Sequence, residues 1–301
     1  MADYGHDVSF GVSIDPAAIG VEHALRTARL ADSLGLDLLA VQDHPYQPGH
    51  LDSWTLLTYL AAATERIAVM PDVADLQLRP PTMLAKAASS LALITGGRVQ
   101  LGVGGGAFPE AIAAMGAPRR TPGAMVTYSE AAVEVLTHAL RGGPVEVSSP
   151  EHSVSYVAGP AVRQRPQVWL GAQQPRMLGL VGRRADGWVA PLNIYVPPDE
   201  VPERQRIIDD AARAAGRDPA RVRRIYNVLG TIGAGSATPG SPGLVGDAAT
   251  WVDFLATAVT ELGFDTFVIW PHGDTGAQLE LLAREVVPAV RRRVAHIRRS
   301  R

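Results

Sequence analysis

The chain of 301 residues contains no cysteine, which excludes disulfides, thiolate metal sites and a cysteine nucleophile. Lysine is almost as scarce, because Lys86 is the only one. The sequence has no long basic run outside Arg291–Arg293 and Arg298–Arg299, and the formal net charge is -2. This charge balance argues against nucleic acid as the main partner.

Long apolar runs are also missing, since none reaches the length of a membrane span. Residues 1–7 lack the charged-then-apolar pattern of a signal peptide, so we expect a cytoplasmic protein without a membrane partner. Hydrophobic residues make up 47% of the chain and charged residues 19%, which allows a large core. Without a break in composition, residues 1–301 are predicted to form a single domain.

Strand and helix signals alternate along the chain. Short apolar runs predict strands at 10–14, 36–41, 67–70, 99–103, 168–172, 185–189, 222–232 and 266–270. Apolar residues at helical spacing predict helices at 21–34, 54–64, 81–93, 129–140, 201–215, 248–262 and 277–294, and another that begins at 175. A small hairpin at 144–147 and 154–157 is inserted, and the glycine- and proline-rich segment 233–243 is expected to be a mobile loop. About eight alternating strands favour an α/β fold with a closed (β/α)8 barrel, the TIM barrel, over an open doubly wound sheet.

The segment 96–106, with the sequence GGRVQLGVGGG, is the most informative part of the chain. A short buried strand runs directly into Gly104, Gly105 and Gly106. Glycines at such a place allow a flat or bulky group to approach the backbone, or allow a positive φ. Because ligands of α/β proteins lie at the carboxyl ends of strands, we interpret these glycines as part of a binding site. A flexible turn is the alternative.

If the chain is a barrel, the residues that follow its strands form the working face. These residues are Ser13, Asp15, Gln42, Asp43, His44, Asp72, Val73, 104–110, Gln173, Gln174, Pro191, Asn193, Trp270 and His272. The set lacks the clustered histidines and carboxylates of a metal site, so no metal is predicted. A Gly-x-Ser-x-Gly elbow is also missing, so covalent hydrolysis has no visible nucleophile.

The segment 170–178 predicts an anion site. A strand is followed by the tight turn Gly171–Gln174 and then by a helix with Pro175 at its start. Free backbone N–H groups at such a helix N-terminus bind phosphate well. Arg176 adds charge or is simply solvated, and the whole turn could be an ordinary connection. A cofactor with a phosphate and a flat ring would explain both this turn and the glycine-rich strand end.

Taken together, these motifs resemble the bacterial luciferase-like oxidoreductase superfamily, whose members are (β/α)8 barrels that use FMN or the deazaflavin coenzyme F420. The resemblance covers nearly the whole chain. It is carried by Asp43-His44, 70–76, 96–106, 170–178, 185–188 and 285–288.

The resemblance implies roles for particular residues. Asp43 and His44 match the pair beside the redox-active ring, and Asp72-Val73 matches a non-proline cis peptide that supports the ring in deazaflavin-dependent members. Glu110 matches a polar cofactor-facing position. The phosphate-binding turn corresponds to Gly171, Ala172, Gln173 and Gln174, although the family often has glycine at the last two positions. Ser13, Gly104, Gly105, Gly106 and Arg176 complete the predicted cofactor-binding set.

His44 is predicted to act at the ring, because an imidazole suits hydrogen bonding and proton transfer near neutral pH. The alternative is a histidine that only holds the loop 42–54. Ala107 stands where the sugar-phosphate dehydrogenases of the family have a catalytic glutamate, and phosphate-binding lysines are not evident. Sugar phosphate is therefore rejected as the substrate.

The favoured function is hydride transfer between coenzyme F420 and a small organic substrate. An FMN-dependent monooxygenase is the alternative, and a non-catalytic barrel is a further one. Asp43-His44 favours the deazaflavin, which does not usefully activate oxygen. The substrate and the oligomeric state are left open, with a homodimer as one option.

Overall fold

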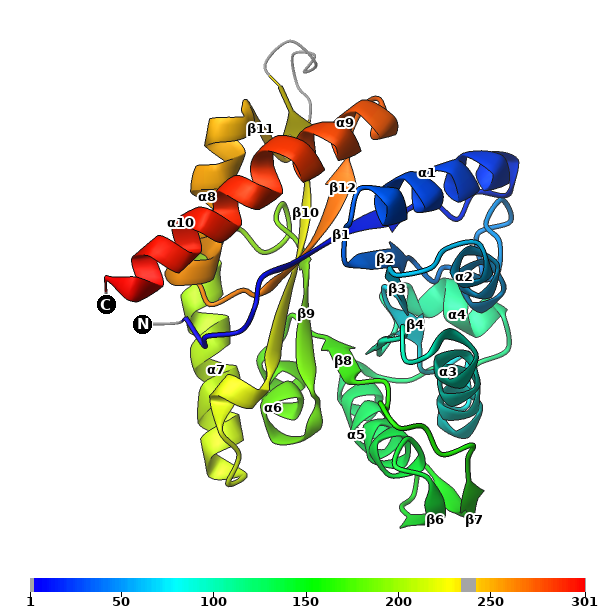
Figure 1. Cartoon of the computed structure of the whole chain (residues 1–301). Coiled ribbons are helices and arrows are strands. Elements are labelled where there is room, and N and C mark those ends of the chain that lie inside the picture. Colours follow the sequence, from blue (N-terminus) through cyan, green and yellow to red (C-terminus); the bar gives the residue numbers. More distant parts are fainter. Residues whose placement is uncertain (1–2, 234–241, 301) are drawn as a thin grey trace.

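The computed structural model describes residues 3–233 and 242–300, and it forms a nearly closed parallel barrel inside a layer of helices (Figure 1). The barrel strands are β1 (Ser9–Ile14), β2 (Leu38–Val41), β3 (Ala68–Pro71), β5 (Leu101–Gly104), β8 (Val168–Gly171), β9 (Gly187–Leu192), β10 (Arg223–Ile232) and β12 (Thr266–Pro271). They pair in the order β3-β2-β1-β12-β10-β9-β8-β5. A parallel bridge between Val69 and Val99 joins the two ends of this order. The predicted (β/α)8 barrel is confirmed.

Helices follow the strands and cover the outside of the barrel (Figure 1). They are α1 (Val21–Ser33), α2 (Ser53–Ala62), α3 (Pro81–Thr95), α4 (Pro109–Ala114), α5 (Pro122–Ala139), α6 (Pro175–Arg184), α7 (Val201–Ala214), α8 (Ala248–Thr260), α9 (Thr275–Leu281) and α10 (Val287–Arg299). Asp52, Asp247 and Asp274 cap α2, α8 and α9 by accepting a backbone N–H from the first turn. None of the helices in the described ranges is long and apolar enough to cross a membrane.

Two apolar clusters divide the core. The larger one lies between the sheet and the helices and includes the buried Trp188 and Trp251. The smaller one consists of Leu38, Ala40, Met70, Trp169, Val189, Ile225 and Val268. Every member comes from a barrel strand, and Val73 and Trp270 pack against it. Alternation of side chains along each strand explains the division, because successive residues point to opposite faces.

Smaller elements decorate the barrel. The antiparallel hairpin of β6 (Gly143–Ser148) and β7 (Ser153–Ala158) is the predicted insertion. It meets α3 where Lys86 Nζ donates a hydrogen bond to the carbonyl of Gly159 at 2.7 Å. The short strands β4 (Ala74–Asp75) and β11 (Leu244–Gly246) pair with β5 and β10, and neither was predicted. Of the predicted mobile loop 233–243, residues 234–241 lie outside the described residues.

Several predicted boundaries are wrong. The helix predicted at 129–140 begins at Pro122, because the Thr121 side chain caps it and proline suits its first turn. The helix predicted at 277–294 is divided by a π-helical turn at Leu282–Val286 and reaches Arg299. The strand predicted at 185–189 is shifted to Gly187–Leu192. Helix α4 was not predicted, since six residues are too few for a periodic signal.

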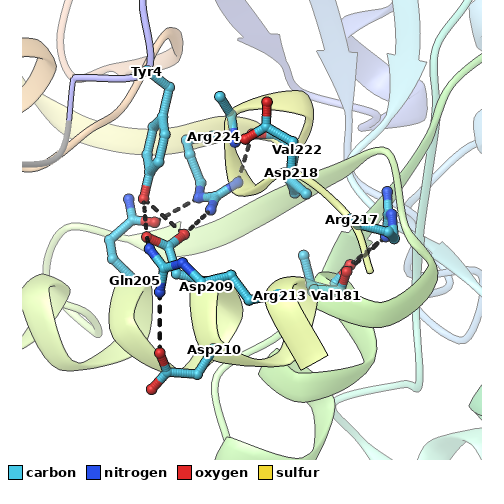
Figure 2. A network of polar contacts seen from close by, with 12 residues as sticks. Tyr4, Val181, Gln205, Asp209, Asp210, Arg213, Arg217, Asp218, Val222 and Arg224 are labelled. Carbon is cyan, nitrogen blue, oxygen red and sulfur yellow. Dashed lines mark hydrogen bonds and ion pairs between the residues drawn. The ribbon is translucent and has the colours of Figure 1, made fainter. Parts of the chain in front are cut away.

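A buried polar network ties the N-terminal segment to the amino end of β10 (Figure 2). Arg224 has a fully buried side chain and donates to Asp209 Oδ1 at 2.9 Å and to Gln205 Oε1 at 2.5 Å. Its guanidinium carbon lies 4.7 Å from the centre of the Tyr4 ring, and the Tyr4 hydroxyl donates to Asp209 at 2.9 Å. The network lies at the end of the barrel opposite the carboxyl ends of the strands.

Candidate functional site

The candidate site lies at the carboxyl ends of the strands, where most residues of the predicted working face are placed. A cavity of about 490 Å³ opens at the ends of β1, β2 and β12. It is lined by Ser13, Gln42, His50 and Trp270 among others. Ser13, one of the predicted cofactor-binding residues, therefore faces open space.

Asp43 is fully engaged by the protein itself. Its side chain is only 1% exposed. Arg79 donates to both carboxylate oxygens, at 2.9 and 2.8 Å. Ser53 Oγ donates at 2.8 Å and the Asp75 backbone N–H at 3.1 Å. A carboxylate held by a bidentate arginine and two further donors shapes the loop and has little capacity left for a ligand.

His44 belongs to a group of aromatic and imidazole rings. Its Nδ1 lies 2.6 Å from the Tyr46 hydroxyl. Phe108 meets the imidazole edge-on at 5.6 Å between ring centres, and His50 lies at 6.5 Å. Burial lowers the pKa of His44 and the nearby His50 adds to this, while Asp43 opposes both. The imidazole is therefore largely neutral at neutral pH.

A series of side-chain hydrogen bonds links Trp270, Asn227 and Asp72. Trp270 Nε1 donates to Asn227 Oδ1 at 2.7 Å, and Asn227 Nδ2 lies 3.5 Å from Asp72 Oδ1. Asp72 Oδ2 is buried and has no hydrogen-bond partner in residues 3–233 and 242–300. Burial raises the pKa of Asp72 to about 7. Asp72 thus changes its protonation state near neutral pH.

Val73 packs against Gly104 and Gly171, the last residues of β5 and β8. The peptide bond between Asp72 and Val73 is cis, as the resemblance implied. A Cβ at Gly104 would lie 2.7 Å from Val73 Cγ2, and one at Gly171 would lie 3.1 Å from it. Glycine at these two strand ends therefore makes room for Val73, which forms an apolar platform at the mouth of the barrel.

Gly105 and Gly106, the two glycines that follow β5, also lie against other parts of the chain. A Cβ at Gly105 would meet Ser129 and Met125. Gly106 has φ +90°, and a Cβ there would lie 2.4 Å from Ile112. The positive φ was one of the two reasons proposed for these glycines. The groups that approach these glycines closely are side chains of the protein itself. A cofactor contact at Gly104–Gly106 stays a prediction.

The turn Gly171–Gln174 is open at the surface. Gln173, Gln174 and Arg176 are exposed, while Ala172 is buried and its carbonyl accepts a hydrogen bond from Trp188 Nε1 at 2.8 Å. Helix α6 begins at Pro175, and Gln174 makes no side-chain cap. The first N–H groups of α6 are therefore available to an anion. Arg176 instead donates to the Gly123 carbonyl and to Thr127, both at 3.0 Å.

Glu110 is a surface residue paired with an arginine. It sits on α4 with 76% of its side chain exposed and forms an ion pair with Arg119. Its predicted contact with the cofactor thus stays a prediction. Among the residues that the structure describes, no three histidine, aspartate or glutamate side chains converge on a possible metal site.

Sequence reasoning missed three residues of the site: Tyr46, Arg79 and Asn227. Asn227 carried a usable signal, because it is a polar residue inside the apolar run 225–232. Arg79 is 36 positions from Asp43, and nothing in the sequence pairs them.

The fold and the site define a (β/α)8 barrel protein with a ligand-binding face at the carboxyl ends of its strands. A profile of the luciferase-like monooxygenase family matches residues 5–238. The chain belongs to this family, whose known members are enzymes.

Comparison with individual proteins gives similarities of a lower degree. The phthiodiolone/phenolphthiodiolone dimycocerosates ketoreductase of Mycobacterium tuberculosis (strain H37Rv) is 30% identical over 201 residues, which cover 65% of this chain and 51% of that protein. The chain thus spans about half the length of this curated relative.

Two solved structures share the fold. The coenzyme F420 dependent tetrahydromethanopterin reductase from Methanopyrus kandleri has a TM-score of 0.80 and 20% identity, covering 94% of this chain and 99% of that one. The oxygenating constituent of 3,6-diketocamphane monooxygenase of Pseudomonas putida, solved in complex with FMN, has a TM-score of 0.73 and 18% identity, covering 94% and 98%.

Proposed function

We propose that this protein transfers a hydride between coenzyme F420 and a small organic substrate. The observation that carries the proposal is the platform formed by Val73 over Gly104 and Gly171, at the mouth of the barrel. Val73 offers an apolar contact for a ring system, and Asp72 precedes it while Trp270 packs against the same apolar cluster. The known members that share this fold include one named for F420 and one bound to FMN, so a cofactor with such a ring fits the family.

Other parts of the face suit the rest of such a cofactor. The uncapped N-terminus of α6 offers backbone N–H groups to a phosphate. His44 lies after β2 with Nε2 free of any partner in the described part of the chain, so it can meet the ring or the substrate. A bound deazaflavin supplies two-electron hydride chemistry. The protein's task is then to orient the ring, exclude water and hold a hydrogen-bonding group at the reacting centre.

FMN is the second candidate cofactor, and it would make the protein a monooxygenase. The deazaflavin is favoured because the Asp43-His44 pair resembles that of deazaflavin users and because the curated relative is named a ketoreductase. A ketone or secondary alcohol is accordingly the preferred substrate class. A barrel without redox function is the third candidate.

Calorimetric titration of the purified protein with F420 and with FMN tests the proposal. We expect binding of F420 in the micromolar range and much weaker binding of FMN. Replacing His44 with alanine should reduce turnover at saturating cofactor by about 10²–10⁴-fold and change cofactor affinity little. Micromolar binding of FMN alone would make the protein a monooxygenase candidate, and binding of neither would favour the non-catalytic barrel.

A further inference from the structure

The contact between His44 and Tyr46 bears on the charge of the histidine and on which of its nitrogens carries the proton. The atoms involved, His44 Nδ1 and Tyr46 Oη, are 2.6 Å apart. Both rings also pack on Phe108, with centres at 5.6 and 5.8 Å. No other hydrogen bond to either ring occurs in residues 3–233 and 242–300. The pair is therefore held together as a unit, and His44 Nε2 is left for a ligand.

The direction of this hydrogen bond follows from the chemistry of its two groups. A phenolic hydroxyl is a better donor than acceptor, and the unprotonated nitrogen of a neutral imidazole is a good acceptor. The 2.6 Å contact between His44 Nδ1 and Tyr46 Oη joins these two atoms directly. The phenol also keeps its proton, because burial and then Asp75 and Asp43 raise the pKa of Tyr46 to about 12. Tyr46 thus donates and His44 Nδ1 accepts.

We propose that Tyr46 is a positioning residue that holds His44 neutral with its proton on Nε2, so that His44 offers a hydrogen-bond donor to the ligand. A neutral imidazole that accepts at Nδ1 must carry its single proton on Nε2. In this state His44 is unable to take a proton from an alcohol through Nε2. It instead addresses an acceptor atom, such as the carbonyl oxygen of a ketone, and this assignment of the ligand rests on the proposed function.

The charged and titratable groups around His44 are consistent with the neutral form. His50 lies at 6.5 Å and opposes a positive charge on His44. Asp43 favours that charge, but its own charge is balanced by the bidentate Arg79. Phe108 contributes an apolar edge. Tyr46 is the one group that contacts an imidazole nitrogen in the described part of the chain.

The test uses ¹⁵N NMR of the histidine rings in the cofactor-free protein. We expect the His44 proton on Nε2 and an acceptor-type signal from Nδ1 at pH 7.5 or above. In Tyr46→Phe, Nδ1 loses its donor and the neutral form loses stabilisation. The pKa of His44 should therefore rise by about 0.5–1 unit, which corresponds to one ordinary net hydrogen bond.

The opposite result would overturn the proposal. If His44 Nδ1 were the donor, the wild-type proton would be found on Nδ1, and Tyr46→Phe would lower the pKa of His44 because the charged form would lose its acceptor. Tyr59→Phe, an exposed tyrosine on α2, is the matched control and should leave the His44 signals unchanged. The measurement needs no cofactor, so a failure here is distinct from a failure to bind F420.

Discussion

Three carboxylates, those of Asp43, Asp72 and Asp75, lie at the strand ends, and their partners give them different properties. Asp43 forms an ion pair with Arg79. Burial raises the pKa of Asp75, although the Gln77 and Leu78 N–H groups counteract this. Asp72 has only the distant Asn227 amide, and its pKa rises to about 7. Hydrogen-bond donors, rather than position after a strand, thus decide which carboxylate can exchange a proton near neutral pH.

Asp72 is expected to make stability depend on pH. Its pKa is about 7 in the folded protein against 3.8 as the ordinary value, so the folded state binds the proton more tightly. The free energy of unfolding should therefore fall as the pH rises from about 4 to 7. The Asp72→Asn variant does not have this loss. Its free energy of unfolding should exceed that of the wild type by about 1–4 kcal/mol at pH 8, with little difference at pH 4.5. Urea unfolding of both proteins at the two pH values measures the effect.

An exposed carboxylate provides the control for this comparison. Asp7→Asn changes the same chemical group at the surface and should reproduce the wild-type pH dependence. Equal pH dependence in Asp72→Asn and the wild type would mean that Asp72 is solvated or paired in solution.

The sequence allowed only part of this site to be predicted. Asp43 and His44 were correctly placed after a buried strand, because an apolar run that ends in polar residues is a local signal. Their separate tasks could not be predicted, since they depend on Arg79 and Tyr46. The platform of Val73 was implied by family resemblance, and its physical reason, the space above Gly104 and Gly171, exists only in the folded barrel.

A substitution at the start of helix α6 is expected to stabilise the folded protein and to weaken cofactor binding. Gln174 has the extended backbone of an N-cap but makes no capping hydrogen bond. Gln174→Asp supplies a cap and should stabilise the protein by about 0.5–2 kcal/mol. The same carboxylate would stand beside a bound phosphate, where two charges at about 4 Å repel by about 1 kcal/mol or more. The dissociation constant of F420 should rise at least several-fold, and more at low salt.

Gln174→Ser separates the two effects. Serine caps the helix without a charge, so thermal stability should rise while cofactor affinity is retained. Calorimetry at two salt concentrations and thermal melts of both variants give the answer. A dissociation constant that is the same for Gln174→Asp and the wild type at both salt concentrations would place the phosphate elsewhere.

Elements with a long periodic signal were predicted well, and elements defined by tertiary contacts were not. Strand β10 and helix α7 agree with their predicted ranges to within one residue. The two-residue β4 exists only because it pairs with β5. The π turn at Leu282–Val286 lies inside an uninterrupted apolar pattern, so periodicity indicated one continuous helix. Local preference fixes element type, and packing decides where each element ends.

At the scale of the whole molecule, a network that stabilises the fold and the candidate binding face lie at opposite ends of the barrel. The Arg224 network joins the amino end of β10 to α7 and the N-terminal segment (Figure 2), whereas the candidate site occupies the carboxyl ends of the strands. Asp209→Ala leaves the buried Arg224 guanidinium without a carboxylate and should lower the free energy of unfolding by about 3–5 kcal/mol. Cofactor affinity, measured well below the melting temperature, should not change.

The adjacent carboxylate is a matched control. Asp210 forms ion pairs with Arg206 and Arg213 at the surface, so Asp210→Ala should cost about 1 kcal/mol or less. Equal losses in the two variants would show that the Arg224 pair contributes no more than a surface ion pair. A marked change in cofactor affinity for Asp209→Ala would show that the two ends of the barrel are coupled.

The scarcity of lysine has a practical consequence that follows from the contact between α3 and the hairpin. Lys86 is the sole lysine, its side chain is exposed, and its Nζ is bonded to the Gly159 carbonyl. Apart from the chain terminus, an amine-reactive dye therefore has one attachment point, on the outer layer of the molecule. A dye attached there stands at the contact between α3 and Gly159, which directly follows β7, and so reports on the position of the hairpin.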